Sequence, residues 1–175
     1  MGSPTPVKRR RTAARNTTVI YRGLKPEMKT AVTAITHAAT TDTYTFINSL
    51  AEGAGQNDRI GARVKIHYIE VQARCALPFR AELLLGNNLT TPSHTADQAV
   101  DRDIFNVLDR VYMNPNSNSG NAEFMKMDHK LPYGLIAKYS AATGADIQKG
   151  KLWLVLSSIA ASTINGYVRI WYTDN

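Results

Sequence analysis

Hydrophobic and polar residues alternate along several short segments of the chain, which is the pattern of half-buried β-strands. Phe79–Leu85 and Tyr167–Thr173 alternate most regularly, so that every second side chain falls on one face. Thr30–His37 and Tyr44–Leu50 are rich in β-branched and aromatic residues, which favour a pleated sheet. Each of these four segments is therefore predicted to form a strand.

The segment Arg63–Cys75 also alternates, but its phase changes in the middle. Apolar residues occupy even positions from Val64 to Tyr68 and odd positions from Ile69 to Cys75. A shift of one residue exchanges the two faces of a strand. The change of phase predicts a β-bulge, or a strand that bends from one sheet towards another.

Three further strands are predicted in the second half of the chain, at Glu123–Leu131, Leu135–Tyr139 and Lys151–Ile159. The last contains five consecutive apolar residues, as expected for a strand that is buried on both faces. The dipeptide Asn165-Gly166 indicates a turn before the final strand.

Asp97–Met113 has a different period. Its apolar residues recur at helical spacing, and Thr95-x-x-Gln98 resembles a capping box. This pattern predicts a short helix inserted between strands.

The number of strands and the length of the loops together predict an all-β fold. About eight short strands are typical of a sandwich or jelly roll. We therefore expect residues 27–175 to form a single eight-stranded jelly-roll sandwich with a short inserted helix.

Charge separates the first 26 residues from the rest. The net charge of the chain is +7, and residues 27–175 hold 14 basic and 14 acidic residues. Residues 1–26 have no acid and too few apolar residues to bury, so we expect a disordered arm. A neutral body with a cationic tail indicates a polyanionic partner. The basic residues of the arm are Lys8, Arg9, Arg10, Arg11, Arg15, Arg22 and Lys25.

The arm suits two roles. Its cations can neutralise nucleic-acid phosphates and release condensed counterions, with little reading of base sequence. The cluster Lys8, Arg9, Arg10 and Arg11 is also typical of a nuclear localisation signal. A tail that only increases solubility is the remaining alternative, although a neutral body does not require one.

The residues that usually build catalytic or metal sites do not fall into such patterns here. The single cysteine, Cys75, lies in an alternating apolar series and is predicted to be a core residue. The longest uncharged segment, Leu152–Val168, contains many polar residues and is short for a membrane span. No enzyme activity, metal, cofactor or membrane partner is therefore expected. The four histidines, none at metal-ligand spacing, are His37, His67, His94 and His129.

Large aromatic residues near the chain end have two possible environments. Trp153, Tyr167 and Trp171 fit either the core or a contact with a neighbouring subunit. The aromatic residues are scattered and not interleaved with basic residues on one strand, so no platform for stacking bases is predicted in the body.

One segment resembles a pattern in the capsid proteins of small circular single-stranded DNA viruses, the circovirus-like or CRESS-DNA viruses. That pattern is an isoleucine, a glycine, Arg-Ile-Gly, a basic residue and a β-branched strand start. The chain end, Tyr172-Thr173-Asp174, is similar to the aromatic-Thr-Asp close of the same group, and the arginine-rich start matches theirs. The residues that meet the pattern are Ile47, Gly53, Arg59, Ile60, Gly61, Arg63 and Val64.

The resemblance implies a jelly roll that builds the smallest icosahedral shell, of T=1 type, from roughly sixty copies. The arm would contact single-stranded DNA inside a virion, after assembly in the host nucleus with the help of an import receptor. Gly61 would permit a tight backbone, and Arg59 would bind a carboxylate of its own or a neighbouring chain.

Two alternatives remain open. Coat proteins of small satellite plant RNA viruses share the plan of an arm and a jelly roll, so RNA is the alternative genome. A cellular nucleic-acid-binding β-barrel module with a basic tail would need basic and aromatic residues on one face of the body.

Overall fold

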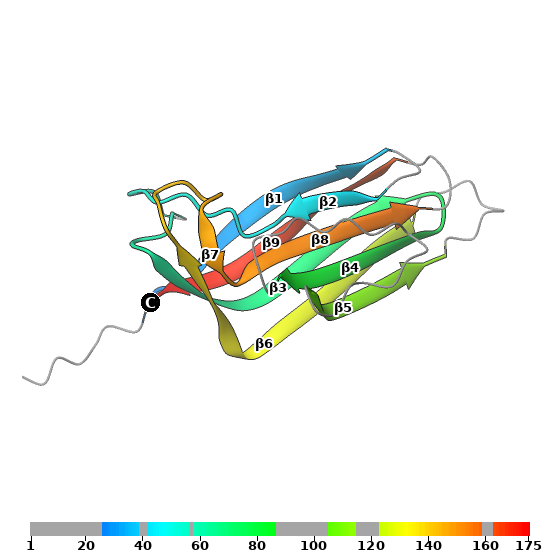
Figure 1. Cartoon of the computed structure of the whole chain (residues 1–175). Coiled ribbons are helices and arrows are strands. Elements are labelled where there is room, and N and C mark those ends of the chain that lie inside the picture. Colours follow the sequence, from blue (N-terminus) through cyan, green and yellow to red (C-terminus); the bar gives the residue numbers. More distant parts are fainter. Residues whose placement is uncertain (1–25, 39–41, 57, 87–104, 115–122, 159–162) are drawn as a thin grey trace, which may run out of the picture.

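The computed structural model describes residues 26–38, 42–56, 58–86, 105–114, 123–158 and 163–175. These residues form two antiparallel β-sheets that pack face to face (Figure 1). The described strands are β1 (Lys29–His37), β2 (Thr43–Phe46), β3 (Arg63–Cys75), β4 (Phe79–Gly86), β5 (Phe105–Met113), β6 (Glu123–Tyr139), β7 (Ile147–Lys149), β8 (Lys151–Ser158) and β9 (Ile164–Asp174).

The order of the strands is that of a jelly roll. Sheet A has the order β1-β9-β3-β6-β7, and sheet B has the order β2-β8-β4-β5. If the short β7 is set aside, the first strand pairs with the last, the second with the next to last, and so on inwards. That nesting is a long hairpin rolled into two sheets. The predicted all-β jelly-roll fold is therefore confirmed.

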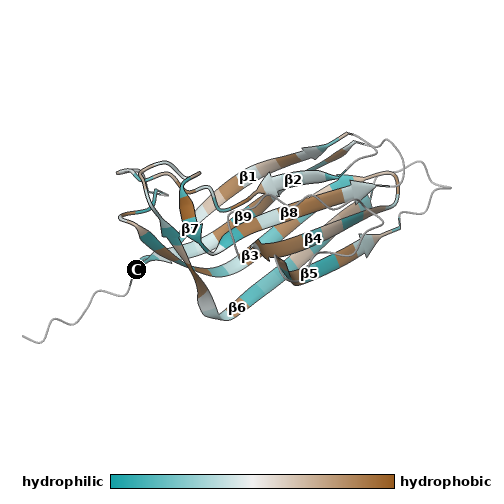
Figure 2. Cartoon of the chain, in the orientation of Figure 1, coloured by the Kyte–Doolittle hydropathy of each residue, from teal (hydrophilic) through white to brown (hydrophobic). Residues whose placement is uncertain are grey.

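The main core fills the space between the two sheets, because alternate residues of each strand face inward. Ile69 and Ile170 of sheet A and Leu83 and Leu154 of sheet B are almost completely buried there. Figure 2 shows hydrophobic and hydrophilic residues following one another along the strands. Cys75 belongs to this core, as predicted.

The predicted bulge in β3 is confirmed, and it has a counterpart in β6. The pairing of β3 with both of its neighbours shifts between Ile66 and Tyr68. Ile66 pairs with Leu135 and Tyr68 with Lys130, so four residues of β6 bulge out. The two strands predicted at Glu123–Leu131 and Leu135–Tyr139 are therefore one bulged strand of 17 residues.

The predicted helix is wrong for the part of Asp97–Met113 that the structure describes. Phe105–Met113 form β5 and pair with β4, while residues 97–104 lie outside the described residues. The pairing shifts at Leu83/Leu84, which leaves Leu108 as an extra residue in β5. This bulge breaks the alternation and produces apolar spacings of three and four, which imitate a helix.

The turn predicted at Asn165-Gly166 is also wrong. Both residues lie inside β9, where Asn165 pairs with Thr36 of β1 and Arg74 of β3. A Cβ atom on Gly166 would lie 2.0 Å from the Gln72 carbonyl oxygen. The glycine is therefore explained by the close approach of β3 and not by a turn.

Candidate functional site

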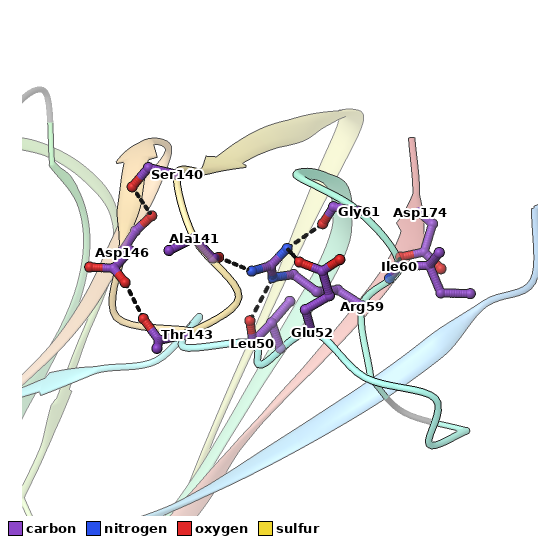
Figure 3. Close-up of polar contacts among 10 residues, drawn as sticks. All are labelled: Leu50, Glu52, Arg59, Ile60, Gly61, Ser140, Ala141, Thr143, Asp146 and Asp174. Carbon is purple, nitrogen blue, oxygen red and sulfur yellow. Dashed lines mark hydrogen bonds and ion pairs between the residues drawn. The ribbon is translucent and has the colours of Figure 1, made fainter.

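Arg59 is the centre of the polar network in the segment between β2 and β3 (Figure 3). Its side chain is fully buried, and its Nε donates a hydrogen bond to the Leu50 carbonyl at 2.8 Å. The terminal nitrogens donate to the carbonyls of Gly61 and Ala141 and to the Glu52 carboxylate, the last at 3.3 Å. Arg59 thus binds a carboxylate of its own chain and fastens the loop after β6 to the segment before β3.

Aromatic and amide side chains complete this network. The Arg59 guanidinium lies 4.3 Å from the centre of the Tyr139 ring, and the Tyr139 hydroxyl donates to the Asn48 carbonyl at 2.8 Å. The Asn48 amide donates to the Gly150 carbonyl at 2.8 Å and accepts from the Leu152 amide at 2.9 Å. Burial raises the pKa of Tyr139. Each of these polar groups is buried together with its partner, which makes the network rigid.

The structure gives the other residues of the capsid-like pattern different environments. Ile47 and Val64 are core residues, whereas Ile60 is 66% exposed and Arg63 is exposed on β3. Gly61 has a φ of +80°, which favours glycine. Gly53 lies against Asp58, where a Cβ atom would come within 2.3 Å of the carboxylate.

A second cluster joins the start of β1 to the end of β9. The Lys29 ammonium lies 2.7 Å from the Asp174 carboxylate and donates to the Asp58 carbonyl at 2.6 Å. Asp174 also accepts a hydrogen bond from the Ile60 amide at 2.8 Å. We call Lys29, Asp58, Ile60 and Asp174 the terminal clamp. It brings the capsid-like pattern and the Tyr-Thr-Asp chain end together at one end of the sandwich (Figure 1).

The predicted arm joins the body at this clamp. The seven basic residues from Lys8 to Lys25 lie outside the described residues, so their role and the boundary at residue 26 stay predictions. β1 begins at Lys29 and is an edge strand of sheet A. Whatever precedes it therefore enters the body beside the last residues of β9.

The outer face of sheet A carries a combination that the sequence analysis missed. Tyr167, Arg169 and Trp171 alternate on β9, and the Arg169 guanidinium lies 5.3 Å and 5.6 Å from the centres of the two rings. Tyr68 of β3 packs against Trp171 with ring centres 4.7 Å apart. We define the aromatic–cationic face as Tyr68, Arg74, Phe124, Tyr167, Arg169 and Trp171.

The same face extends along β3 to the edge of β6. The Arg74 guanidinium lies 5.6 Å from the centre of the Phe124 ring, which is 75% exposed. Lys126 and Lys130 follow Phe124 on the outward side of β6, where both are exposed. Arginine that stacks on aromatic rings keeps its charge available to an anion.

The two acids on this face are engaged by neighbouring side chains. Glu70 accepts hydrogen bonds from the Tyr167 hydroxyl and the Gln72 amide, each at 3.0 Å. Asp128 accepts one from the Tyr68 hydroxyl, which holds the pKa of its carboxyl below the usual value, with the Lys126 ammonium at 2.9 Å as a second cause. Arg74, Lys130 and Arg169 form no ion pair within the described part of the chain.

Part of this face could have been recognised from the sequence. The spacing Tyr167-x-Arg169-x-Trp171 puts three such side chains on one side of a single strand. Tyr68 and Phe124 join them only because β3 lies between β9 and β6, and that order follows from the jelly-roll topology. Trp153, in contrast, is buried on the outer side of sheet B with Leu84, Phe105 and Val155.

The described residues contain no group of three or more histidine, cysteine or acidic side chains arranged to hold a metal ion. They also include no helix with the length and apolar character needed to cross a membrane.

Two solved structures are distantly similar to the chain. No protein-family model matches the chain, and no curated protein matches it significantly. The chain is similar to the TNF protein Eiger from S. frugiperda, with 9% identity over 86% of this chain and 96% of that one and a TM-score of 0.37. It is also similar to VP1 of trichodysplasia spinulosa-associated polyomavirus, with 10% identity over 85% and 77% of the chains and a TM-score of 0.14. TM-scores this low support no conclusion about this chain, and the assignment of the jelly-roll fold depends on the order of its strands alone.

Proposed function

We propose that this protein is a viral capsid protein that assembles into a small icosahedral shell, of T=1 type, and packages single-stranded nucleic acid. The observation that carries the proposal is the segregation of charge. All seven net positive charges precede a jelly-roll body whose acidic and basic residues balance. A balanced body can pack against copies of itself, whereas the arm requires a polyanion.

The proposed mechanism couples packaging to assembly. Contacts between bodies are individually weak, and arms gathered on one nucleic-acid strand raise the local concentration of the bodies. Phosphates also cancel the repulsion between arms. A shell of roughly sixty copies would bring roughly 420 arm charges, so a longer genome requires other counterions as well.

The ligand of this proposal is single-stranded DNA, with RNA as the alternative. The arm residues assigned to phosphate binding are Lys8, Arg9, Arg10, Arg11, Arg15, Arg22 and Lys25. The cluster from Lys8 to Arg11 would also bind a host nuclear import receptor, which takes the protein to the nucleus before assembly.

Size-exclusion chromatography at moderate salt tests the proposal, with absorbance recorded at 260 and 280 nm and negative-stain microscopy of any void-volume peak. Uniform small spheres rich in 260 nm absorbance are expected. A monomer peak that persists after single-stranded nucleic acid is added would contradict the capsid proposal.

The aromatic–cationic face favours a second candidate, a cellular nucleic-acid-binding module with a basic tail. That candidate requires basic and aromatic residues on one face, a condition that the outer face of sheet A meets. Its body would be a jelly-roll sandwich and not a barrel. It predicts a monomer or small oligomer that binds oligonucleotides, so the same chromatography separates it from the capsid.

A further inference from the structure

We propose that the aromatic–cationic face of sheet A is a second nucleic-acid contact, which stacks the bases of a single strand independently of the arm. The inference rests on the proposed function for the class of its ligand. It assigns to the body a contact with bases, whereas the arm contacts phosphates.

Stacking is favoured by the rings that the fold gathers on this face. Tyr167, Trp171 and Tyr68 are partly exposed, and Phe124 is 75% exposed. They come from three neighbouring strands, β9, β3 and β6. Every base has a flat π-face, so rings on an open sheet bind single strands with little dependence on base sequence.

The charges on this face favour a phosphate backbone. Four cations, Arg74, Lys126, Lys130 and Arg169, face two acids, Glu70 and Asp128, so the net charge is +2. Both acids already accept hydrogen bonds from neighbouring side chains.

The same charges argue against a second copy of the chain as the occupant. Charged residues are depleted at the centres of protein interfaces. A symmetric contact through this face would also place its cations against their own copies.

Chain continuity favours the same ligand for the arm and the face. All nine residues of β1 pair with β9, and Trp171 pairs with Thr30, next to the clamp residue Lys29. A strand held by the residues before β1 therefore lies within reach of the face.

Tryptophan fluorescence tests this inference on the full-length chain, freed of bound nucleic acid by high salt. The chain has two tryptophans, and Trp153→Phe leaves Trp171 as the only one. Oligo(dT) and oligo(U) are each titrated at about 0.4 M salt, where phosphate contacts contribute little. We expect quenching of Trp171 by either oligonucleotide and none by polyphosphate, which has the charge but no bases.

Matched variants separate stacking from folding. Trp171→Leu keeps an apolar side chain but no ring, and should weaken binding of a labelled oligonucleotide roughly fivefold or more. Trp171→Phe keeps a ring and should stay close to the parent protein. Tyr112→Ala, on β5 of the other sheet and 67% exposed, is the control for loss of an exposed ring and should have no effect.

Two results would overturn the inference. One is equal quenching by polyphosphate, and the other is equal affinity of the Trp171→Leu and Trp171→Phe variants. If Trp171→Leu instead abolishes spheres without changing oligonucleotide affinity, the face is a subunit interface. If the protein forms spheres but oligonucleotides do not quench Trp171, this inference alone is rejected. If oligonucleotides quench Trp171 in a protein that never forms spheres, only the capsid proposal is rejected.

Discussion

Arg59 is a charged residue in a position that a hydrophobic residue would normally occupy. Arginine is seldom fully buried unless its charge and its donors find partners. Here three carbonyls, one carboxylate and one aromatic ring surround the guanidinium. The planar group reaches all of them at once, which the single ammonium of lysine does not.

Replacing Arg59 by lysine should therefore destabilise the body by about 2–4 kcal/mol, because buried carbonyls lose their donors. Urea denaturation followed by tryptophan fluorescence measures the change. Arg63→Lys is the matched control, since Arg63 is exposed and its replacement should alter the free energy of unfolding by less than about 0.5 kcal/mol. Equal stability of the two variants would show that the Arg59 network does not hold the loops.

Two buried tyrosines, Tyr139 and Tyr172, and the partly buried Tyr44 predict a loss of stability at alkaline pH. Burial raises the pKa of Tyr44 and Tyr172 from 10.0 to about 12, and also raises that of Tyr139. A raised pKa means that the folded protein holds the proton more tightly than the unfolded chain does. The free energy of unfolding should therefore be unaffected below about pH 10 and fall as the pH rises above it.

Absorbance at 295 nm, recorded with urea denaturation between pH 8 and about pH 11, checks this expectation. Part of the tyrosinate signal should appear only together with unfolding. One reversible titration of all eight tyrosines in a protein that stays folded would contradict it.

The sequence identified some site residues and not others, for a physical reason. Arg59 and Asp174 belong to patterns that can be recognised along the chain. Lys29 and Tyr139 do not, because their partners Asp174 and Arg59 are 145 and 80 residues away by their sequence numbers. Only the folded sheet order brings such pairs together.

At the scale of elements, β9 organises sheet A. It pairs with β1 on one side and β3 on the other, so its backbone is hydrogen-bonded along both edges. Gly166 lies close to β3, with the Gln72 carbonyl and the Ala73 Cα next to the space for a Cβ atom. A side chain there can be accommodated only if the two strands move apart.

Gly166→Ala should therefore destabilise the body by about 2–3 kcal/mol, through overpacking against a rigid backbone. Gly61→Ala is the comparison. No atom lies within 4 Å of its added Cβ, so only the positive φ costs about 1–2 kcal/mol. Urea denaturation of both variants ranks them, and a smaller loss for Gly166→Ala would contradict the close approach of β3.

The bounds of β3 and its bulge were predicted correctly, whereas the bulged strands β5 and β6 were not recognised. β1, β4 and β8 lie within one residue of their predicted bounds. β5 was taken for a helix and β6 for two strands, because bulges interrupt the period of two in each. β7 was missed, since three residues are too few to show a period. Pairing with neighbouring strands determines the structure of β5, β6 and β7, and the spacing of apolar residues along the chain does not reveal that pairing.

At the scale of the whole molecule, the net charge and the β-sandwich body lie in different parts of the sequence. The body is held by burial between two sheets, whereas the net charge precedes β1. The two parts should therefore be separable by deletion.

Deleting residues 1–26 should leave the unfolding transition of the body unchanged within about 0.5 kcal/mol and abolish nucleic-acid packaging. The ratio of absorbance at 260 and 280 nm in purified particles reports packaging, and circular dichroism reports the fold. The matched control replaces Lys8, Arg9, Arg10 and Arg11 by glutamine, which keeps the length of the arm and removes four charges. Particles of the deletion variant that still carry nucleic acid would contradict the assignment of the arm.

The terminal clamp also determines on which side of the body a fused protein would lie. Lys29 and Asp174 are in direct contact, so whatever precedes β1 and whatever is attached after Asn175 leave the body at the same corner. An enzyme or fluorescent protein fused to the carboxyl end would lie on the same side of a wall as the cationic arm. In a shell whose arms point inward, such fusions would fill the lumen and leave the exterior unchanged.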